Sequence, residues 1–183
     1  MRPGDSVYLI GMMGCGKSTL GRLLARRLRR EFLDSDAVIE DRTQVRIPMI
    51  FDLEGEAGFR EREAAVLAEL VRQPGIILAT GGGAVLREDN RDALRSHGIV
   101  IYLHASIPVL FERTRHAKGR PLLAVADPMK RLAELYQIRD PLYRETAHLV
   151  VETDNGRTSA LVGRVLQGIE KCLSRNPPTR RPS

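Results

Sequence analysis

Tryptophan is absent from this chain of 183 residues, cysteine occurs only twice, and no apolar run approaches the roughly 18 residues of a membrane-spanning helix. Cys15 and Cys172 lie too far apart in sequence to make a disulfide framework or a metal knuckle, which favours a reducing compartment. The first residues also lack the apolar core of a signal peptide. We therefore expect a cytoplasmic protein with no membrane partner.

Aromatic residues make up only 4% of the chain, and this weighs against nucleic-acid binding despite a formal net charge of +6. Arg175, Arg180 and Arg181 supply three positive charges in a proline-rich segment, residues 175–183, which we expect to be a disordered basic tail. No basic stretch is interleaved with aromatic side chains that would stack on bases. A nucleic-acid-binding module therefore stays only as an alternative, which removal of the tail would test.

Short apolar segments alternate with helical patterns, as they do in chains of β-α-β units. We expect strands over residues 7–10, 31–33, 76–79, 99–103 and 148–152. Because these segments are apolar throughout, they predict strands buried on both faces, hence an α/β fold with a parallel sheet between helices. The length and a hydrophobic content of 43% fit a single domain, residues 1–174.

Two segments interrupt this alternation. Residues 37–73 show two or three helical patterns, at about 37–42, 47–54 and 56–72, and a helical insertion after the second strand is a suitable place for a substrate subdomain. Residues 115–127, with Gly119, Pro121 and several long basic side chains, are followed by Pro128 and lie between two helices, which favours a mobile lid over a plain surface loop.

The most informative motif is a phosphate-binding loop. Residues 11–18 match G-x-x-x-x-G-K-[ST]. An apolar run precedes them and an amphipathic stretch follows, so the motif has the strand-loop-helix context that it requires. Lys17 is placed to reach the β- and γ-phosphates, and Ser18 is suited to Mg²⁺. Cys15, near a helix N-terminus, is either a reactive thiolate or a small buried filler. We expect a nucleoside triphosphate site formed by Gly14, Cys15, Gly16, Lys17, Ser18 and Thr19.

Two aspartates end the second expected strand, at the edge of the sheet where ligands gather in parallel α/β folds. The i,i+2 spacing of Asp34 and Asp36 places both carboxylates on one side. One can then organise Mg²⁺ and its water while the other accepts a proton from an attacking hydroxyl. Spacing leaves the two interchangeable, and Asp36 is also a possible N-cap of the next helix.

A second group of residues indicates a pocket for the acceptor substrate. Arg60 and Glu63 share a helix face at i,i+3, so the carboxylate can hold the guanidinium in place. Phe51 and Phe59 lie near enough in sequence to form a wall of that pocket. The three consecutive glycines at residues 81–83 give a backbone without side chains, which indicates that another group approaches it closely.

Two further arginines matter for the transferring phosphate and the substrate. Arg120, in the expected lid, can move onto the phosphate, a role that Lys118 could share. Arg139 precedes Asp140 and Pro141 near a helix end, and its spacing does not distinguish it from the other arginines.

Taken in order, these segments resemble the shikimate kinases over roughly residues 7–168. The resemblance rests on the set and on its order: the phosphate-binding loop at 11–18, Asp34-Ser35-Asp36 with Ile39-Glu40, Ile50-Phe51, Gly55-Glu56, Phe59-Arg60-Glu61-Arg62-Glu63, Ala79-Thr80-Gly81-Gly82-Gly83, Arg120-Pro121-Leu122-Leu123 and Arg139-Asp140-Pro141-Leu142-Tyr143. It implies a nucleoside-monophosphate-kinase-like, three-layer αβα P-loop fold with a five-stranded parallel sheet in the order 2-3-1-4-5. It also implies an enzyme that uses ATP and Mg²⁺ to phosphorylate the 3-hydroxyl of shikimate in aromatic amino-acid biosynthesis. We expect this enzyme to be a monomer.

Carried over position by position, the resemblance assigns a role to each candidate residue. Catalysis would fall to Asp36, Lys17 and Arg120, and magnesium to Ser18 and Asp34. Shikimate would be held by Asp36, Arg60, Gly82 and Arg139, with Arg60 and Arg139 on its carboxylate. To these we add Phe51, Phe59, Glu63, Gly81 and Gly83, which the residue pattern above places on the substrate side. Arg113 would lie against the adenine, and Arg157, in a loop that matches the family only loosely, is a further candidate on the nucleotide side.

The chain departs from the family before the helix of Phe51. Residues 43–47 read Thr-Gln-Val-Arg-Ile where shikimate kinases usually have Thr-Gly-x-Ser-Ile, so the small turn residue and the serine cap are both missing. Pro48, which follows, suits a first helical turn. Two alternatives to a shikimate kinase are another small-molecule kinase of this fold, acting on gluconate or a nucleoside monophosphate, and a nucleotide-binding regulator without activity.

Overall fold

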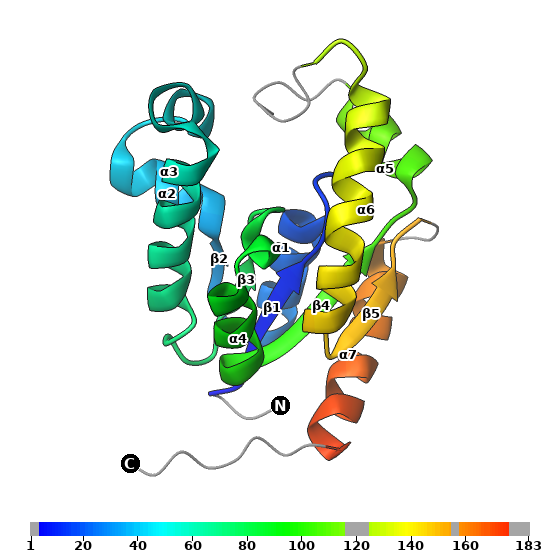
Figure 1. Ribbon diagram of the computed structural model, residues 1–183. Helices are drawn as coiled ribbons and strands as arrows, with labels where there is room; N and C mark the ends of the chain where they lie inside the picture. The colour runs from blue at the N-terminus through cyan, green and yellow to red at the C-terminus, as the bar shows by residue number, and fades with distance from the viewer. Residues whose placement is uncertain (1–3, 116–124, 155–157, 176–183) are drawn as a thin grey trace.

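Five parallel strands form one sheet in the computed structural model, which describes residues 4–115, 125–154 and 158–175 (Figure 1). The order is β2-β3-β1-β4-β5, and β1 pairs with β3 on one side and with β4 on the other. This confirms the expected α/β fold and strand order. The strands are β1 (Ser6–Ile10), β2 (Phe32–Asp34), β3 (Ile77–Ala79), β4 (Gly98–His104) and β5 (Leu149–Glu152).

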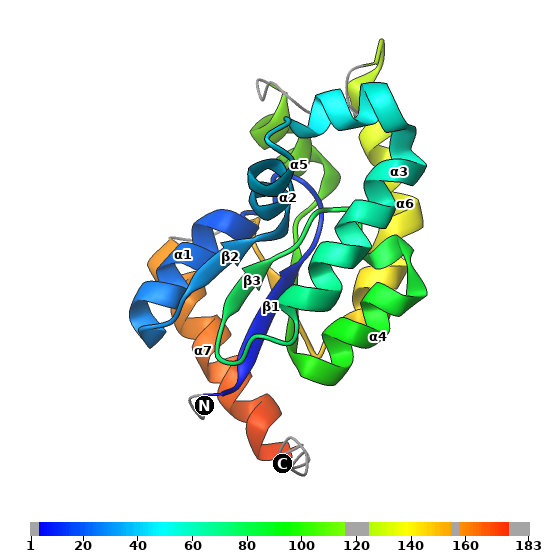
Figure 2. The same cartoon turned by 90° about the vertical axis from the view of Figure 1, so that its left-hand side faces the viewer.

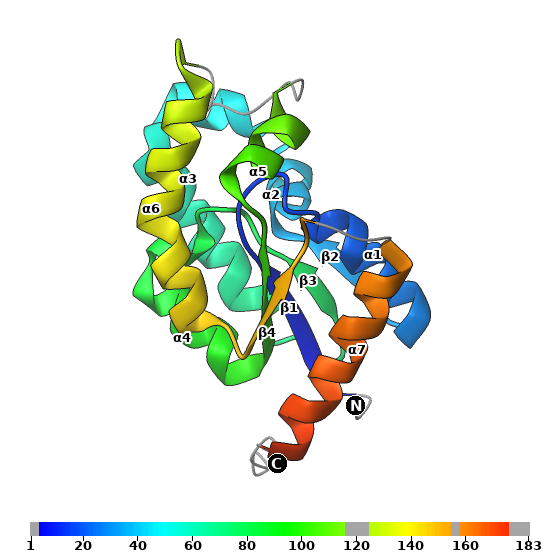
Figure 3. The same ribbon diagram turned by 90° about the vertical axis from the view of Figure 1, so that its right-hand side faces the viewer.

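Helices cover both faces of the sheet, as Figures 2 and 3 show. Helices α1 (Lys17–Leu28) and α7 (Thr158–Arg175) lie on one face, and α3 (Ile47–Leu70), α4 (Glu88–His97) and α6 (Pro128–Thr146) on the other. Three shorter elements connect them: α2 (Ser35–Thr43), α5 (Ile107–Thr114) and the 3₁₀ turn η1 (Ala84–Leu86). No helix within the described part of the chain combines the length and apolarity needed to cross a membrane.

The central strands are buried on both faces, but the edge strands are not. Every residue of β1 and β3 is buried, whereas Val150 in β5 is 39% exposed. The prediction of burial on both faces is therefore wrong for β5, and β2 is only partly buried. An edge strand has a neighbour on one side only, so an apolar sequence does not guarantee that both of its faces are covered.

Helix α1 shows how the sequence positions the phosphate-binding loop. Leu20 and Leu24, spaced i,i+4, are buried, and Gly21 lies so close to the Phe32 ring that a side chain there would clash. The helix ends at Arg29, which adopts a left-handed conformation with φ 54°. The apolar face thus fixes α1 against the sheet with its N-terminus at the loop.

The helical insertion consists of α2 and α3, and α3 is broken at Gly55. The φ and ψ angles of Gly55 are 72° and −178°, so residues 47–54 and 56–70 are two helical segments, as the sequence predicts. Figure 2 shows the first segment lying across the top of the molecule and the second running down beside α4.

The segment that departs from the family keeps its helix start by other contacts. Gln44 adopts the left-handed conformation at the end of α2, with φ 55°. The backbone N–H of Ile47 donates a 2.9 Å hydrogen bond to Oε1 of Glu40, and Pro48 occupies the first turn of α3. A glutamate from α2 therefore accepts one of the first N–H groups of α3, which have no carbonyl partner within the helix.

Candidate active site

The phosphate-binding loop lies at the carboxyl end of β1, in the position where parallel sheets bind ligands. Gly14 and Gly16 have φ angles of 81° and 99°, which L-residues rarely adopt, so the loop needs glycine at both positions. The Nζ atom of Lys17 donates to the carbonyls of Gly11 at 2.8 Å and Met12 at 3.0 Å. The loop is thus ordered around its lysine.

Asp34 joins the end of β2 to the N-termini of α1 and α2. Its Oδ2 accepts a 2.7 Å hydrogen bond from the hydroxyl of Ser18, and its Oδ1 accepts from the backbone N–H of Asp36 at 3.2 Å. Asp34 is therefore the N-cap of α2, and the alternative that Asp36 caps this helix is wrong. Asp36 lies within the first turn instead.

The side chain of Asp36 faces the site without a partner for one oxygen. Its Oδ1 is buried and has no hydrogen-bond partner among the described residues. Burial, helped by the nearby carboxylates of Asp34 and Glu63, raises the pKa of Asp36 to about 6. A carboxyl group in this setting can accept a hydrogen bond, and then a proton, from a substrate hydroxyl.

The three glycines leave room for charged side chains of the protein itself. A Cβ atom at Gly81 would clash with Oε1 of Glu63 and would lie 2.7 Å from Oδ1 of Asp36. A Cβ atom at Gly83 would clash with the guanidinium of Arg60. The expected close approach is confirmed, and at these two glycines protein side chains make it.

Gly82 differs from its two neighbours. The position of a Cβ atom there is 3.6 Å from Nη1 of Arg139, an ordinary contact distance, and Gly82 lines the pocket described below. Its backbone therefore stays accessible to a ligand.

Arg60 is held by two glutamates. Its guanidinium pairs with Glu63 and with Glu56, each at 2.8 Å, and Glu63 is completely buried. Burial raises the pKa of Glu63, although the charge of Arg60 opposes the rise. The i,i+3 pair expected from the sequence is confirmed, while Glu56 was missed even though it stands at i−4 from Arg60 on the same helix.

Arg139 is the largest fully buried side chain among the described residues, with 2% of its surface exposed. Its Nε, like that of Arg60, is buried with no hydrogen-bond partner in the described part of the chain. Burial lowers the pKa of Arg139, because no carboxylate compensates fully for the lost water. Two guanidinium groups with unused donors form a suitable site for a carboxylate ligand.

Phe51 and Phe59 lie together, with ring centroids 4.8 Å apart and planes inclined by 36°. Phe59 is buried and its ring is 5.2 Å from Cζ of Arg60. The expected aromatic wall is therefore present beside the arginine.

On the nucleotide side, Arg113 connects two loops. It donates to the carbonyls of Thr153 at 2.8 Å and Gly14 at 3.4 Å, so it lies between the phosphate-binding loop and the loop after β5. Cys15 is only 1% exposed, which contradicts its interpretation as an accessible reactive thiol. Arg120, Lys118 and Arg157 fall outside the described residues.

A pocket of about 330 Å³ unites the nucleotide side with the two aspartates. It is lined by Met13, Gly14, Gly16, Lys17, Ser18, Thr19, Asp34, Asp36, Thr80, Gly82 and Arg113. Arg60, Glu63, Arg139 and the two phenylalanines do not line it, but form a neighbouring cluster whose charged groups lie against the three glycines. Met13 and Thr80 line the pocket without having been predicted, and only their places after β1 and β3 pointed to them.

The oxygen donors of the site suit magnesium only together with a nucleotide. Residues 4–115, 125–154 and 158–175 contain no group of three His, Cys, Asp or Glu side chains placed to hold a metal. Mg²⁺ usually keeps several waters and takes oxygen ligands from substrate phosphates and one or two side chains. The Ser18 hydroxyl and Asp34 carboxylate therefore fit a nucleotide-bound magnesium ion, and do not fit a metal held by protein alone.

The family model of shikimate kinase matches residues 13–170. The chain belongs to the shikimate kinase family. A shikimate kinase of Burkholderia lata is 54% identical over 168 residues, which cover 92% of this chain and 91% of the relative. One of Bordetella pertussis is 56% identical over 164 residues, covering 90% of this chain and 78% of the relative.

Solved structures agree with this family. A shikimate kinase from Acinetobacter baumannii in complex with shikimate has a TM-score of 0.89 and 48% identity, covering 94% of this chain and 95% of that one. A gluconokinase from Sinorhizobium meliloti has a TM-score of 0.63 at 20% identity over 96% of this chain and 97% of its own, which shows a shared fold only. Together with the site, these findings place the chain among the shikimate kinases and its activity among phosphotransferases.

Proposed function

We propose that this protein transfers the γ-phosphoryl group of ATP to the 3-hydroxyl of shikimate, giving shikimate 3-phosphate and ADP. The observation that carries the proposal is the adjacency of two half-sites. A phosphate-binding loop with Asp36 at its edge lies next to a cluster in which Arg60 and Arg139 keep unused donors. A nucleotide and a small carboxylic acid with a hydroxyl group match these two halves.

In the proposed reaction, the hydroxyl oxygen forms a bond to the γ-phosphorus while the bond from that phosphorus to the β–γ bridging oxygen breaks. The electron pair of the broken bond leaves with ADP, and the hydroxyl proton passes to a carboxylate oxygen of Asp36. The transition state of phosphoryl transfer is loose, so the main contribution of Asp36 is to orient the hydroxyl.

Each remaining residue has a role in binding or in balancing charge. Arg60, oriented by Glu56 and Glu63, and Arg139 hold the carboxylate of shikimate, and the Gly82 backbone lies beside it. Lys17 neutralises the phosphates, and Arg113 packs on the nucleotide from the side of Thr153. Arg120, in the lid expected at residues 115–127, would add a positive charge to the transferring group.

Ser18 and Asp34 would hold Mg²⁺ together with the nucleotide. When bound, this ion supplies charge neutralisation on the β- and γ-phosphates. The hydrogen bond between the two side chains places their oxygen atoms 2.7 Å apart before any ion arrives.

We also propose that the enzyme is a cytoplasmic monomer with a single domain over residues 1–174. The support is that every described residue of both half-sites comes from one chain. Sedimentation at working concentration tests the monomer, because a stable dimer would sediment at twice the mass of the chain.

The proposed reaction is tested by coupling ADP release to an optical signal with shikimate, gluconate or AMP as the acceptor. We expect ADP release only with shikimate, since gluconate and AMP lack a carboxylate and a hydroxyl in the same arrangement on a ring. Faster turnover with gluconate or AMP would contradict the proposal. Absence of turnover with all three acceptors, while ATP still binds, would favour a nucleotide-binding regulator.

A further inference from the structure

Tyr143 lies between the two halves of the site and interacts with the guanidinium of Arg139. It lies on α6 one turn after Arg139, on the same face of the helix, and no part of it is exposed. Its hydroxyl donates a hydrogen bond to the carbonyl of Gly82, and it lies 3.7 Å from Sδ of Met12 in the phosphate-binding loop. A single buried hydroxyl therefore contacts the glycine segment and the loop at once.

The partner of this hydroxyl is the carbonyl of the middle residue in the run of three glycines. Gly82 stands between two glycines, and a glycine backbone can adopt many conformations. It also lines the pocket and lies at contact distance from Arg139. A hydrogen bond to its carbonyl fixes the orientation of the peptide that joins Gly82 to Gly83.

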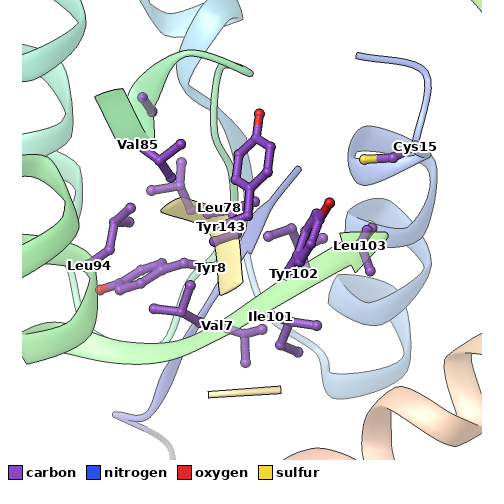
Figure 4. Packing of buried hydrophobic residues seen from close by; sticks show 14 of the residues in the cluster. Val7, Tyr8, Cys15, Leu78, Val85, Leu94, Ile101, Tyr102, Leu103 and Tyr143 are labelled. Carbon is purple, nitrogen blue, oxygen red and sulfur yellow. The ribbon is translucent and has the colours of Figure 1, made fainter. Parts of the chain in front are cut away.

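Tyr102 offers a natural comparison. Its ring stacks on Tyr143 with centroids 4.9 Å apart and planes inclined by 28°, and Figure 4 shows both hydroxyls at the same end of the pair. The Tyr102 hydroxyl, however, donates to Oδ1 of Asp140 at 2.7 Å, and Asp140 also pairs with Arg144. The two tyrosines thus share one aromatic stack, but only Tyr143 bonds to the glycine segment.

We propose that Tyr143 is a positioning residue for the acceptor substrate: its hydroxyl fixes the Gly82 backbone against which shikimate binds beside Arg139. This inference rests on the proposed function. Burial raises the pKa of Tyr143, so the hydroxyl stays protonated and remains a donor across the working pH range. The position also explains why a tyrosine, with a ring that fills the core and a donor at its tip, is placed here.

The test compares Tyr143→Phe with Tyr102→Phe, since each variant keeps the ring and loses one hydroxyl. For Tyr143→Phe we expect KM for shikimate to rise about tenfold, with kcat and KM for ATP changed less than about twofold. For Tyr102→Phe we expect all three constants to stay within about twofold of the wild type, because Asp140 keeps its pairing with Arg144.

Calorimetric titration of each variant with shikimate and with Mg-ADP separates positioning from damage to the fold. Weaker shikimate binding with normal Mg-ADP binding in Tyr143→Phe alone would support the proposal. Equal effects in the two variants, or loss of Mg-ADP binding in Tyr143→Phe, would overturn it. A wild type that does not phosphorylate shikimate would overturn the proposed function. If the wild type is active but the two variants show the same kinetic constants and ligand affinities as each other, only the positioning role is overturned.

Discussion

The hydroxyl of Ser18 donates a 2.7 Å hydrogen bond to Oδ2 of Asp34, so the N-terminus of α1 and the end of β2 are joined at the place where magnesium is expected. The other oxygen of Asp34 caps α2. One carboxylate thus supports both the expected metal site and the helix that carries Asp36.

Asp34→Asn should chiefly raise the Mg²⁺ concentration needed for half-maximal rate, because the site loses a negative charge. Asparagine caps helices as well as aspartate does, so α2 should keep its start and stability should change little. The measurement is the initial rate over a series of Mg²⁺ concentrations at saturating substrates. An unchanged Mg²⁺ dependence would remove Asp34 from the metal site.

Asp36→Asn should lower kcat by roughly 10²–10⁴ while nucleotide still binds, the usual scale for a positioned acid-base group. The amide keeps the size of the side chain, but it replaces one acceptor oxygen with a donor NH₂ group, so it orients the hydroxyl less well and cannot take up its proton. The exposed carboxylate of Asp41, on the same helix, gives the control Asp41→Asn, for which we expect normal kcat. Near-normal kcat in Asp36→Asn, or a shift confined to its Mg²⁺ dependence, would mean that the roles of the two aspartates are wrongly assigned.

Arg60→Lys and Arg139→Lys should each raise KM for shikimate at least tenfold, on the order of 1.4 kcal/mol, with little change in ATP affinity. An ammonium group cannot reproduce the two parallel donors that a guanidinium offers to a carboxylate. Arg62→Lys is the matched control, since Arg62 is on the same helix as Arg60 but forms an exposed pair with Glu54. A parallel loss of ATP affinity in the first two variants would argue against a carboxylate site.

Thiol reagents should modify Cys172 before Cys15, since Cys15 is 1% exposed and Cys172 is partly exposed. We expect one fast-reacting thiol per chain in the native protein, with activity retained after it reacts. In Cys172→Ser the fast phase should vanish. Rapid inactivation of Cys172→Ser, with protection by Mg-ATP, would instead show that Cys15 is reactive.

His148 should make stability depend on pH. Its Nδ1 accepts a 3.0 Å hydrogen bond from the backbone N–H of Val100, and burial, together with the charge of Arg95, lowers its pKa. The unfolded chain therefore takes up a proton more readily than the folded one, so this contribution is complete above about pH 6.5 and is lost as the pH falls below it.

We expect the free energy of unfolding of the wild type to fall more steeply between pH 7.5 and 5.5 than that of His148→Asn, whose amide oxygen can replace Nδ1 as acceptor. Denaturant unfolding at several pH values measures both slopes. The comparison is needed because Asp36 and Glu63, with raised pKa values, contribute with the opposite sign. Parallel curves for the two proteins would contradict the assignment.

Local spacing was enough to predict those parts of the site whose residues stand close together in sequence, on neighbouring helical turns or at strand ends. The phosphate-binding loop, the two aspartates and the Arg60–Glu63 pair each depend on residues a few positions apart, and the structure contains all three arrangements. Arg139 could be named only through resemblance, because its place depends on how α6 packs beside the glycine segment. That packing is a tertiary property that spacing does not encode.

The predictions that proved wrong failed for the same reason, because they depend on tertiary packing. The exposed face of β5 follows from its place at the edge of the sheet, and the burial of Cys15 from the neighbouring backbone of Gly11. Neither can be derived from the composition of the segment itself. Although the serine cap of α3 is missing, the start of this helix has an acceptor, Glu40, that lies seven residues earlier on another helix.

The break at Gly55 ties two distant positions together. Residues eight apart on a straight helix are separated by about 12 Å along its axis, yet the rings of Phe51 and Phe59 meet at 4.8 Å. They can meet because Gly55 adopts a conformation that is almost restricted to glycine. We therefore expect the aromatic pair and the glycine to be coupled in evolution: lineages that replace Gly55 should also lose the selective reason to keep both phenylalanines.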